Sequence, residues 1–229
     1  MGKEGGHSEI EIAKQFGIDL DRLIAEQKRL SKLVKLKDEM DFSVADTLAG
    51  CANSFIGNRI ISSIIVCNSN FEIIEQCYSE KRMEFPYIRG FRAYRELPAM
   101  IDCFNKLQEI PDVIFVEGHG IAHPYLLGIA SHFGISIQRP TIGIAQKLLS
   151  GEISGDKIIL NGKEVGSCLV TKEGSNPIYV SPGHMISPKT ALKLTKQFLK
   201  LPHKLPEPLV IARRYSDKIR KELASNTST

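Results

Sequence analysis

The sequence predicts an α/β domain built on a mixed β-sheet, in which an antiparallel meander is extended by parallel strands and flanked by helices. Three strand-like runs follow one another at residues 42–48, 59–67 and 71–78, and short connections separate them, which indicates a meander. From residue 113 to residue 145 a strand, a helix and a second strand alternate. This order is typical of parallel strands joined by a covering helix.

The first half of the chain begins with a predicted helix. Apolar residues from Leu20 to Val34 recur at a spacing of three and four, which is typical of an amphipathic helix laid on a core. We expect residues 49–53 to connect the first two strands of the meander. Met100 and Leu107 then mark a further helix before the short buried strand at residues 113–116.

A second helix is predicted at residues 124–133, where Pro124 opens it and Gly134 ends it. A strand follows at residues 141–145. Beyond it, Asn161-Gly162 stands between two apolar runs, which is the strongest short-range signal of a β-hairpin.

The last third of the chain is predicted to contain a strand at residues 178–180 and two helices. Ser187 offers an N-cap, and Pro188 fits the first helical position. A basic helix then covers residues 209–223. Between residues 189 and 221 there are ten Lys or Arg residues against two acidic ones, so a polyanion could bind here, or the charges could form a solvated helix face.

The composition favours a globular domain. Of the 229 residues, 42% are hydrophobic and 24% charged, with a formal net charge of +4, which excludes a disordered or collagen-like protein. No apolar run approaches the roughly 18 residues of a membrane span and no secretory signal is visible, so we expect a cytoplasmic protein without membrane contact. Five cysteines without a CxxC pair indicate free thiols. We expect a flexible segment at residues 1–17, one domain at residues 18–223, a tail at residues 224–229, and a monomer.

Three acids occupy positions that suggest chemistry. Asp46 lies on the face of the first predicted strand that also carries Phe42 and Leu48, where a lone carboxylate is costly to bury. Glu117 follows a wholly apolar run, at the carboxyl end of a predicted parallel strand, where α/β sheets place their ligands. Glu96 stands at a junction between loop and helix. Carboxylates from separate elements suit a hard cation such as Mg²⁺.

Each acid also has a structural interpretation. Asp46 could accept hydrogen bonds at a strand edge or turn, and Glu117 could cap the loop that follows it. Glu96 could pair with Arg92 or Arg95 near the start of a helix. These alternatives remain open for each acid taken singly.

Glycines and histidines cluster directly after Glu117. The run Glu-Gly-His-Gly-Ile-Ala-His-Pro lets the backbone come close to a planar or phosphorylated ligand, and His119 and His123 can donate to phosphate or relay a proton. A glycine turn with helix capping by His123 is the alternative. A second predicted loop at residues 181–184 ends in His184, for which a turn and a functional imidazole are both open.

Residues 85–92 read Phe-Pro-Tyr-Ile-Arg-Gly-Phe-Arg. A stiff turn that presents Tyr87 and Ile88 can insert between bases, while arginines bind the phosphates. The alternative is a surface turn whose aromatic side chains pack on the core.

Five motifs, in order and at family spacing, resemble the endonuclease V family. They are residues 85–96, the stretch from Val113 to His132, the strand at residues 140–145, the hairpin with Val165-Gly166, and the segment Val180-Ser181-Pro182-Gly183-His184. Residues 25–30 also fit its amino-terminal helix, and the likeness spans about residues 20–215. The resemblance implies a ribonuclease H-like fold, in agreement with the mixed sheet predicted above.

The resemblance also implies a metal-dependent endonuclease of DNA repair that recognises deaminated adenine. Such enzymes hydrolyse the second phosphodiester bond 3′ to the lesion and leave 3′-hydroxyl and 5′-phosphate ends. Carried onto this sequence, Asp46 and Glu117 are direct ligands of Mg²⁺, for which Mn²⁺ can substitute, and Glu96 holds metal-bound water. His184 assists near the cation or the phosphate.

The implied partner is DNA that contains deoxyinosine, with single-stranded DNA and inosine-containing RNA as further substrates. The base must leave the stack to be read. The parts implied to bind the strand are a strand-separating wedge of Pro86, Tyr87, Ile88 and Arg89 and a base pocket of Gly118, Gly128 and His123.

Four residues depart from the family pattern: Glu117 replaces an aspartate, Arg89 a proline, Tyr125 an arginine and Gln146 a lysine. The longer side chain of Glu117 displaces its carboxylate by about 1 Å, which can disturb an octahedral Mg²⁺ site. Two main hypotheses follow. The first is a Mg²⁺-dependent, inosine-directed endonuclease, and the alternative is a catalytically weak protein of the same fold that binds inosine-containing nucleic acid. A third is a related nuclease acting on branched or hybrid substrates.

Overall fold

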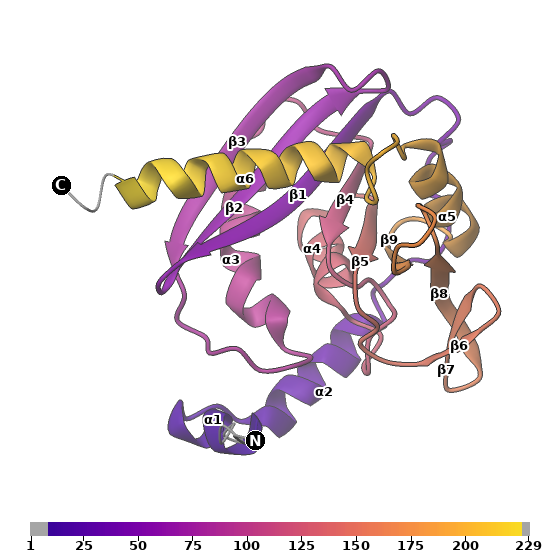
Figure 1. The fold of residues 1–229 in the computed structure, drawn as a ribbon. Coiled ribbons are helices and arrows are strands. Elements are labelled where there is room, and N and C mark those ends of the chain that lie inside the picture. Colours follow the sequence, from indigo (N-terminus) through magenta and orange to yellow (C-terminus); the bar gives the residue numbers. More distant parts are fainter. Residues whose placement is uncertain (1–8, 226–229) are drawn as a thin grey trace.

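The computed structural model describes residues 9–225 of the chain (Figure 1). Its helices are α1 (Glu9–Gln15), α2 (Leu20–Ser31), α3 (Arg92–Phe104), α4 (Ile129–Ile137), α5 (Pro188–Gln197) and α6 (Glu207–Ser225). Its strands are β1 (Thr47–Ile56), β2 (Arg59–Asn68), β3 (Ile73–Arg82), β4 (Val113–Glu117), β5 (Thr141–Ala145), β6 (Glu152–Ser154), β7 (Lys157–Leu160), β8 (Lys163–Leu169) and β9 (Ile178–His184).

Within the described residues the strands form one nine-stranded sheet, in the order β3-β2-β1-β4-β5-β9-β8-β7-β6. β1, β2 and β3 form an antiparallel meander, and β4 and β5 run parallel to β1. The remaining strands continue the sheet in antiparallel pairs. The predicted meander with a parallel extension is therefore confirmed.

Helices cover both faces of the sheet. On one face, α5 and α6 pack on a buried cluster that includes Leu48 and Leu209. On the other face, α3 and α4 pack on a cluster that includes Met100 and Phe133. Figure 1 shows α6 lying across β1 and β2. This crossing brings the carboxyl-terminal helix close to the ends of the central strands.

The first strand differs from its prediction. β1 spans Thr47–Ile56, so the predicted strand at residues 42–48 is wrong, and the predicted connection at residues 49–53 lies inside β1. The small residues here serve packing rather than a turn. A Cβ on Gly50 would lie 2.1 Å from the carbonyl oxygen of Pro208, so the glycine allows α6 to approach the sheet.

Two other boundaries also shift because of tertiary packing. α4 begins at Ile129 rather than at Pro124, and Gly134 lies inside the helix instead of ending it. A Cβ on Gly134 would lie 2.4 Å from Thr141 Oγ1, so the glycine permits α4 to lie against β5. Similarly, β9 continues through residues 181–184, where the sequence predicts a loop.

The predicted hairpin and helix cap are confirmed. Asn161 and Gly162 both have positive φ, at 51° and 73°, in the turn between β7 and β8. The Ser187 side chain accepts a hydrogen bond from the backbone N–H of Thr190, and Pro188 is the first residue of α5. These local signals involve few neighbours, which is why the sequence locates them correctly.

The amino-terminal segment is partly helical. Within the segment 1–17, for which we expect flexibility, Glu9–Gln15 forms α1, and Ala13 is buried in one cluster with Ile88. Residues 1–8 and 226–229 lie outside the described part of the chain. None of the helices in the described part is long and apolar enough to cross a membrane. The five cysteines are free, as predicted.

Candidate nucleic-acid site and acidic centre

Two strands end side by side at one edge of the sheet. β1 and β4 run parallel with Cys51 opposite Val116, so the next residues along them are Ala52 and Glu117. Side chains alternate along a strand, and Ala52 and Phe115 belong to the cluster under α6, so Glu117 also lies on that face. Ala52 has no polar group. The strand position beside Glu117 therefore offers no metal ligand.

Glu117 pairs with an arginine from α6. Its Oε2 lies 3.5 Å from Arg213 Nε, and the two side chains are 25% and 41% exposed. Both side chains line a polar hollow of about 110 Å³ together with Asn53, Ser54, Ser216 and Asp217. The negative charge of Glu117 is thus offset within this hollow.

Glu96 is buried on α3, with only 3% of its side chain exposed. Arg92 Nε donates to Oε1 at 2.6 Å, and Asn53 Nδ2 donates to Oε2 at 2.7 Å. Burial lowers the pKa of Arg92, but the carboxylates of Glu96 and Glu117 outweigh burial and raise that pKa above its usual value. Of the two arginine partners considered for Glu96, Arg92 is the one that the structure places beside it.

Asp46 lies at the opposite end of the sheet. It precedes β1, is exposed, and its backbone N–H donates to Asp112 Oδ2 at 3.0 Å. Ser69 Oγ donates to Asp46 Oδ1 at 3.3 Å. Asp46 lies six positions before Ala52, the neighbour of Glu117 on β1. Six positions correspond to about 20 Å of extended strand. The expected convergence of Asp46 with the other two acids is therefore wrong. Its contacts agree with the alternative, in which Asp46 accepts a hydrogen bond at a turn or strand edge.

His184 is also remote from Glu117. β9 places Val180, not His184, opposite Ile144, the β5 residue that pairs with Glu117. The His184 side chain is 1% exposed, burial lowers its pKa, and its Nδ1 accepts a hydrogen bond from the backbone N–H of Lys35 at 3.3 Å. The expected position of His184 beside the acids is wrong, and the ring instead contacts the segment after α2.

The acids at this edge do not fit the magnesium centre that the resemblance implies. Within residues 9–225, no group of three or more His, Cys, Asp or Glu side chains is placed to hold a metal ion. Glu96 and Glu117 each pair with an arginine, so their formal charges cancel. Asn53 Oδ1 is buried without a hydrogen-bond partner, but one neutral carbonyl does not replace a carboxylate as a ligand for a hard divalent cation.

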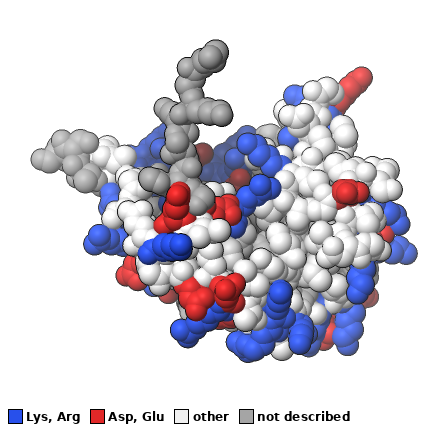
Figure 2. All heavy atoms as spheres, turned by 90° about the horizontal axis from the view of Figure 1, so that it is seen from below, with Lys and Arg blue, Asp and Glu red and all other residues white. Residues whose placement is uncertain are grey.

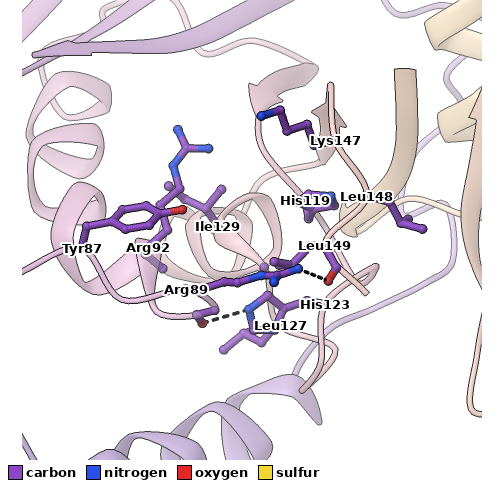
Figure 3. Close-up of a pocket in the computed structure, with 13 residues that line it drawn as sticks. Tyr87, Arg89, Arg92, His119, His123, Leu127, Ile129, Lys147, Leu148 and Leu149 are labelled. Atoms are coloured by element: carbon purple, nitrogen blue, oxygen red, sulfur yellow. Dashed lines mark hydrogen bonds between the residues drawn. The ribbon is translucent and has the colours of Figure 1, made fainter. Parts of the chain in front are cut away.

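We call Glu96, Glu117 and their arginine partners the acidic centre. A cavity of about 270 Å³, lined in part by Arg92, opens beside it (Figure 3). Its polar lining consists of Tyr87, Arg89, Arg92, His119, His123 and Lys147, and Leu127, Ile129 and Leu148 contribute apolar walls. In Figure 3, Tyr87 and Arg92 lie on one side of the cavity, and His119 and Lys147 lie on the other. None of the described residues that line the cavity is acidic. The cavity therefore combines apolar walls with positive charge.

Hydrogen bonds hold the loop before α3 against the rest of the cavity wall. Arg89 Nη2 donates to the carbonyl oxygen of Leu149 at 3.1 Å. His123 Nε2 lies 2.9 Å from the carbonyl oxygen of Gly90, and its Nδ1 accepts a hydrogen bond from the backbone N–H of Tyr125 at 3.3 Å. Because a carbonyl oxygen only accepts, His123 carries its proton on Nε2. His123 therefore positions the walls of the cavity.

The two histidines of the cavity are uncharged near neutral pH. Burial lowers the pKa of both His119 and His123 to about 4. Protonation of either ring would place a charge in a region that already contains Arg92. The positive charge of the cavity therefore comes from its arginines and its lysine.

The two predicted pocket glycines permit close backbone packing around the cavity. A Cβ on Gly128 would lie 2.3 Å from the carbonyl oxygen of His119, so this cavity-lining position has no room for a side chain. Gly118 has a φ of 150°, and a Cβ there would lie 2.3 Å from Ile129 Cγ2. Gly118 thus stands behind a lining residue, whereas Gly128 is part of the lining.

The predicted wedge is only partly available to a strand. Tyr87 is 61% exposed, and Arg89 is exposed beside it. Ile88 is 1% exposed and packs near Ala13 of α1, so it belongs to the core and cannot enter a base stack. Pro86 is half-buried. Of the four predicted wedge residues, Tyr87 and Arg89 are therefore the ones that the structure leaves exposed.

Sequence reasoning missed two residues of the acidic centre, Asn53 and Arg213. Asn53 is predicted to lie in a connection, and only the observed limits of β1 place it in the strand, where it donates to Glu96. Arg213 has no local signal, because its pairing with Glu117 depends on how α6 crosses the sheet.

Comparison with known proteins agrees with the fold. A family model described as Endonuclease V matches residues 28–214. The chain is 36% identical over 222 residues to the Endonuclease V of Thermosipho melanesiensis, covering 92% of this chain and 93% of the relative. The solved endonuclease V of Bacillus subtilis has a TM-score of 0.82 and 28% identity, covering 92% of this chain and 96% of that chain.

A third relative was solved with nucleic acid. The endonuclease V of Ciona intestinalis, in complex with a 23mer DNA containing an inosine followed by a ribo-adenosine, has a TM-score of 0.80 and 22% identity, covering 89% of this chain and 98% of that chain. The solved relatives share the mixed sheet flanked by helices, which is the predicted ribonuclease H-like fold. The family match extends over most of the sequence. The chain therefore belongs to the endonuclease V family.

Proposed function

We propose that this protein binds nucleic-acid strands that contain inosine and holds the extruded base in the cavity beside Glu117, while metal-dependent cutting is weak or lost. One observation carries the proposal: an open cavity adjoins an acidic centre whose two carboxylates are both paired with arginines. Family membership supports the ligand class, since the Ciona intestinalis relative was solved with inosine-containing DNA.

The cavity has the parts that base recognition needs. Extruding a base costs a few kcal/mol, and least where pairing is already weak, so a residue that fills the gap lowers the cost. Tyr87 is exposed at the cavity wall and can stack on a base, a contact worth about 1–3 kcal/mol. Arg89 and Lys147 attract the neighbouring phosphates. The proposed ligands are strands with deoxyinosine or inosine that are single or locally unpaired.

Cutting needs a different set of groups. Hydrolysis of the second bond 3′ to inosine, the activity implied by the resemblance, requires Mg²⁺ or Mn²⁺ held by carboxylates beside the scissile phosphate. In this chain Ala52 lies beside Glu117. Glu96 forms an ion pair with Arg92, and Glu117 forms one with Arg213. We therefore expect slow nicking or none with either cation.

A pair of labelled single strands that differ only by inosine or adenine tests the proposal. Fluorescence polarisation should show at least about a tenfold preference for inosine, equivalent to about 1.4 kcal/mol. Tyr87→Ala should weaken binding by about tenfold, because it removes one stacking contact. Tyr78→Ala is the matched control, since this exposed tyrosine lies on β3, outside the cavity.

Gel electrophoresis of the same strands after incubation with Mg²⁺ or Mn²⁺ tests the cutting. The proposal predicts intact strands at enzyme concentrations that saturate binding. Fast nicking at a single position would support the endonuclease hypothesis instead, and equal affinity for the two strands would reject inosine recognition.

A further inference from the structure

The Arg213 guanidinium pairs with Glu117, one of the two acids that the resemblance assigns to a metal ion. It projects from α6 to Glu117 at the carboxyl end of β4, in the hollow lined also by Asn53 and Asp217. A guanidinium keeps its positive charge throughout the pH range in which proteins fold. A permanent cation is therefore built into the site.

Arg213 retains capacity for an anionic ligand. Within residues 9–225, the Arg213 side chain makes one polar contact, the ion pair between its Nε and Glu117. Both Nη groups are without a hydrogen-bond partner there. Its side chain is 41% exposed. Asp217, the other acid of the hollow, accepts a hydrogen bond from Arg220 Nε at 3.3 Å, so a cation accompanies it as well. The acids of the hollow thus hold arginines and do not present unbalanced negative charge.

A second arginine, Arg92, lies between the Glu117 hollow and the cavity. Arg92 interacts electrostatically with both Glu96 and Glu117 and also lines the base cavity. Seen from below, Lys and Arg side chains gather in the upper centre of the molecule (Figure 2). A phosphate next to an extruded base would therefore meet arginines on both sides of Glu117.

We propose that Arg213 binds a phosphodiester group of the strand directly and replaces the divalent cation, so that strand binding by this protein needs no divalent metal ion. The inference rests on the proposed function, because the strand must reach the hollow from the cavity. A guanidinium matches the geometry of phosphate oxygens through paired N–H donors. Glu117 orients this guanidinium through Nε and leaves the Nη groups directed to the ligand.

The test compares wild type, Arg213→Ala and Arg214→Ala with the inosine and adenine strands, in EDTA and in Mg²⁺, over a range of salt. Arg214 is the matched control, because it follows Arg213 on α6 but lies 2.9 Å from His203 Nε2 and does not line the hollow. Circular dichroism verifies that each variant is folded. Arg213→Lys keeps the charge but loses the paired donors, and it should bind with intermediate affinity.

The wild-type affinity should change less than about twofold between EDTA and Mg²⁺. Arg213→Ala should weaken binding to both strands by the same factor, and the slope of log affinity against log salt should fall by about 0.7, the value for one phosphate contact on a single strand. Arg214→Ala should leave this slope unchanged. A preference for inosine that persists in every variant would show that Arg213 contacts phosphate rather than base.

Two results would overturn the inference and leave the proposed function standing. One is a wild-type protein that prefers inosine in Mg²⁺ but releases the strand in EDTA. The other is an Arg213→Ala variant that binds like wild type with an unchanged salt slope. Equal wild-type binding of inosine and adenine strands would instead reject the proposed function.

Discussion

The cavity lined by Tyr87 and Arg92 and the acidic centre adjoin each other at the end of β4, but the first carries excess positive charge and the second contains paired charges. The cavity is lined by cationic, aromatic and apolar side chains and leaves room for a ligand. In the acidic centre, Glu96 and Glu117 each have an arginine partner, and Ala52 occupies the adjoining strand position. The comparison teaches that two neighbouring sites on one fold can differ in charge balance, so the chemistry must be argued from each site and not from the fold.

Within the acidic centre the two ion pairs also differ, and the largest expected effect comes from the buried one. Glu96→Ala removes the buried carboxylate that accepts hydrogen bonds from Arg92 Nε and Asn53 Nδ2, which should lower the free energy of unfolding by about 2–4 kcal/mol. Urea denaturation measures this loss. A loss below about 1 kcal/mol would indicate that Glu96 is a free carboxylate rather than a structural one, and would break the comparison.

The cavity wall at Gly128 has no room for a methyl group. Gly128→Ala would place a Cβ 2.3 Å from the carbonyl oxygen of His119, so we expect a destabilisation of about 1–3 kcal/mol and loss of the inosine preference. Gly155→Asn is the control, because no atom lies within 4 Å of a Cβ there and Asn tolerates positive φ. A Gly128→Ala variant that still prefers inosine would place the base elsewhere.

The cavity histidines should make stability depend on pH. Their folded-state pKa values are about 4, below the ordinary value of about 6.5, so the unfolded chain binds more protons between these two values. Stability should be full above about pH 6.5 and fall towards pH 4, by up to about 1.4 kcal/mol per pH unit for each histidine.

Denaturation curves from pH 7.5 to pH 4.5 measure this slope. His123→Asn should flatten it, because the substitution removes one of the buried histidines whose pKa is lowered. An unchanged slope would mean that His123 titrates normally in the folded protein and that its ring is not held by Gly90.

The smallest expected effect is at Glu117. Its partner Arg213 is 41% exposed, and exposed ion pairs contribute about 0–1 kcal/mol, so Glu117→Gln should change the free energy of unfolding by less than about 1 kcal/mol. The contrast with Glu96→Ala sharpens the distinction between a structural acid and an acid that orients a ligand-binding arginine. A loss of several kcal/mol would contradict it.

The sequence located the recognition parts better than the chemical centre. Glu117 and His123 lie where a strand end and its following loop are predicted, because apolar runs and glycine turns are local signals, whereas Gly128, predicted inside a helix, precedes α4. Asp46 was misplaced because the small residues of β1 resemble a connection. Their actual role, the close contact of Gly50 with α6, depends on a segment more than 150 residues away.

The arginine partners of Glu96 and Glu117 differ in how far the sequence reveals them. Arg92 stands one helical turn before Glu96, so its pairing could be considered from the sequence. Arg213 meets Glu117 only after α6 crosses the sheet, and no periodicity reports such a contact. Similarly, Ile88 looks like part of an exposed wedge until α1 is found to cover it.

Calorimetric titration of the wild-type protein with Mn²⁺ tests the central claim most directly, because it measures metal binding without any nucleic acid. If Arg92 and Arg213 neutralise the acids of this centre, no saturable site should be detected at millimolar Mn²⁺, and Glu117→Gln should give the same trace as wild type. Saturable binding of one ion by wild type, abolished in Glu117→Gln, would contradict the account.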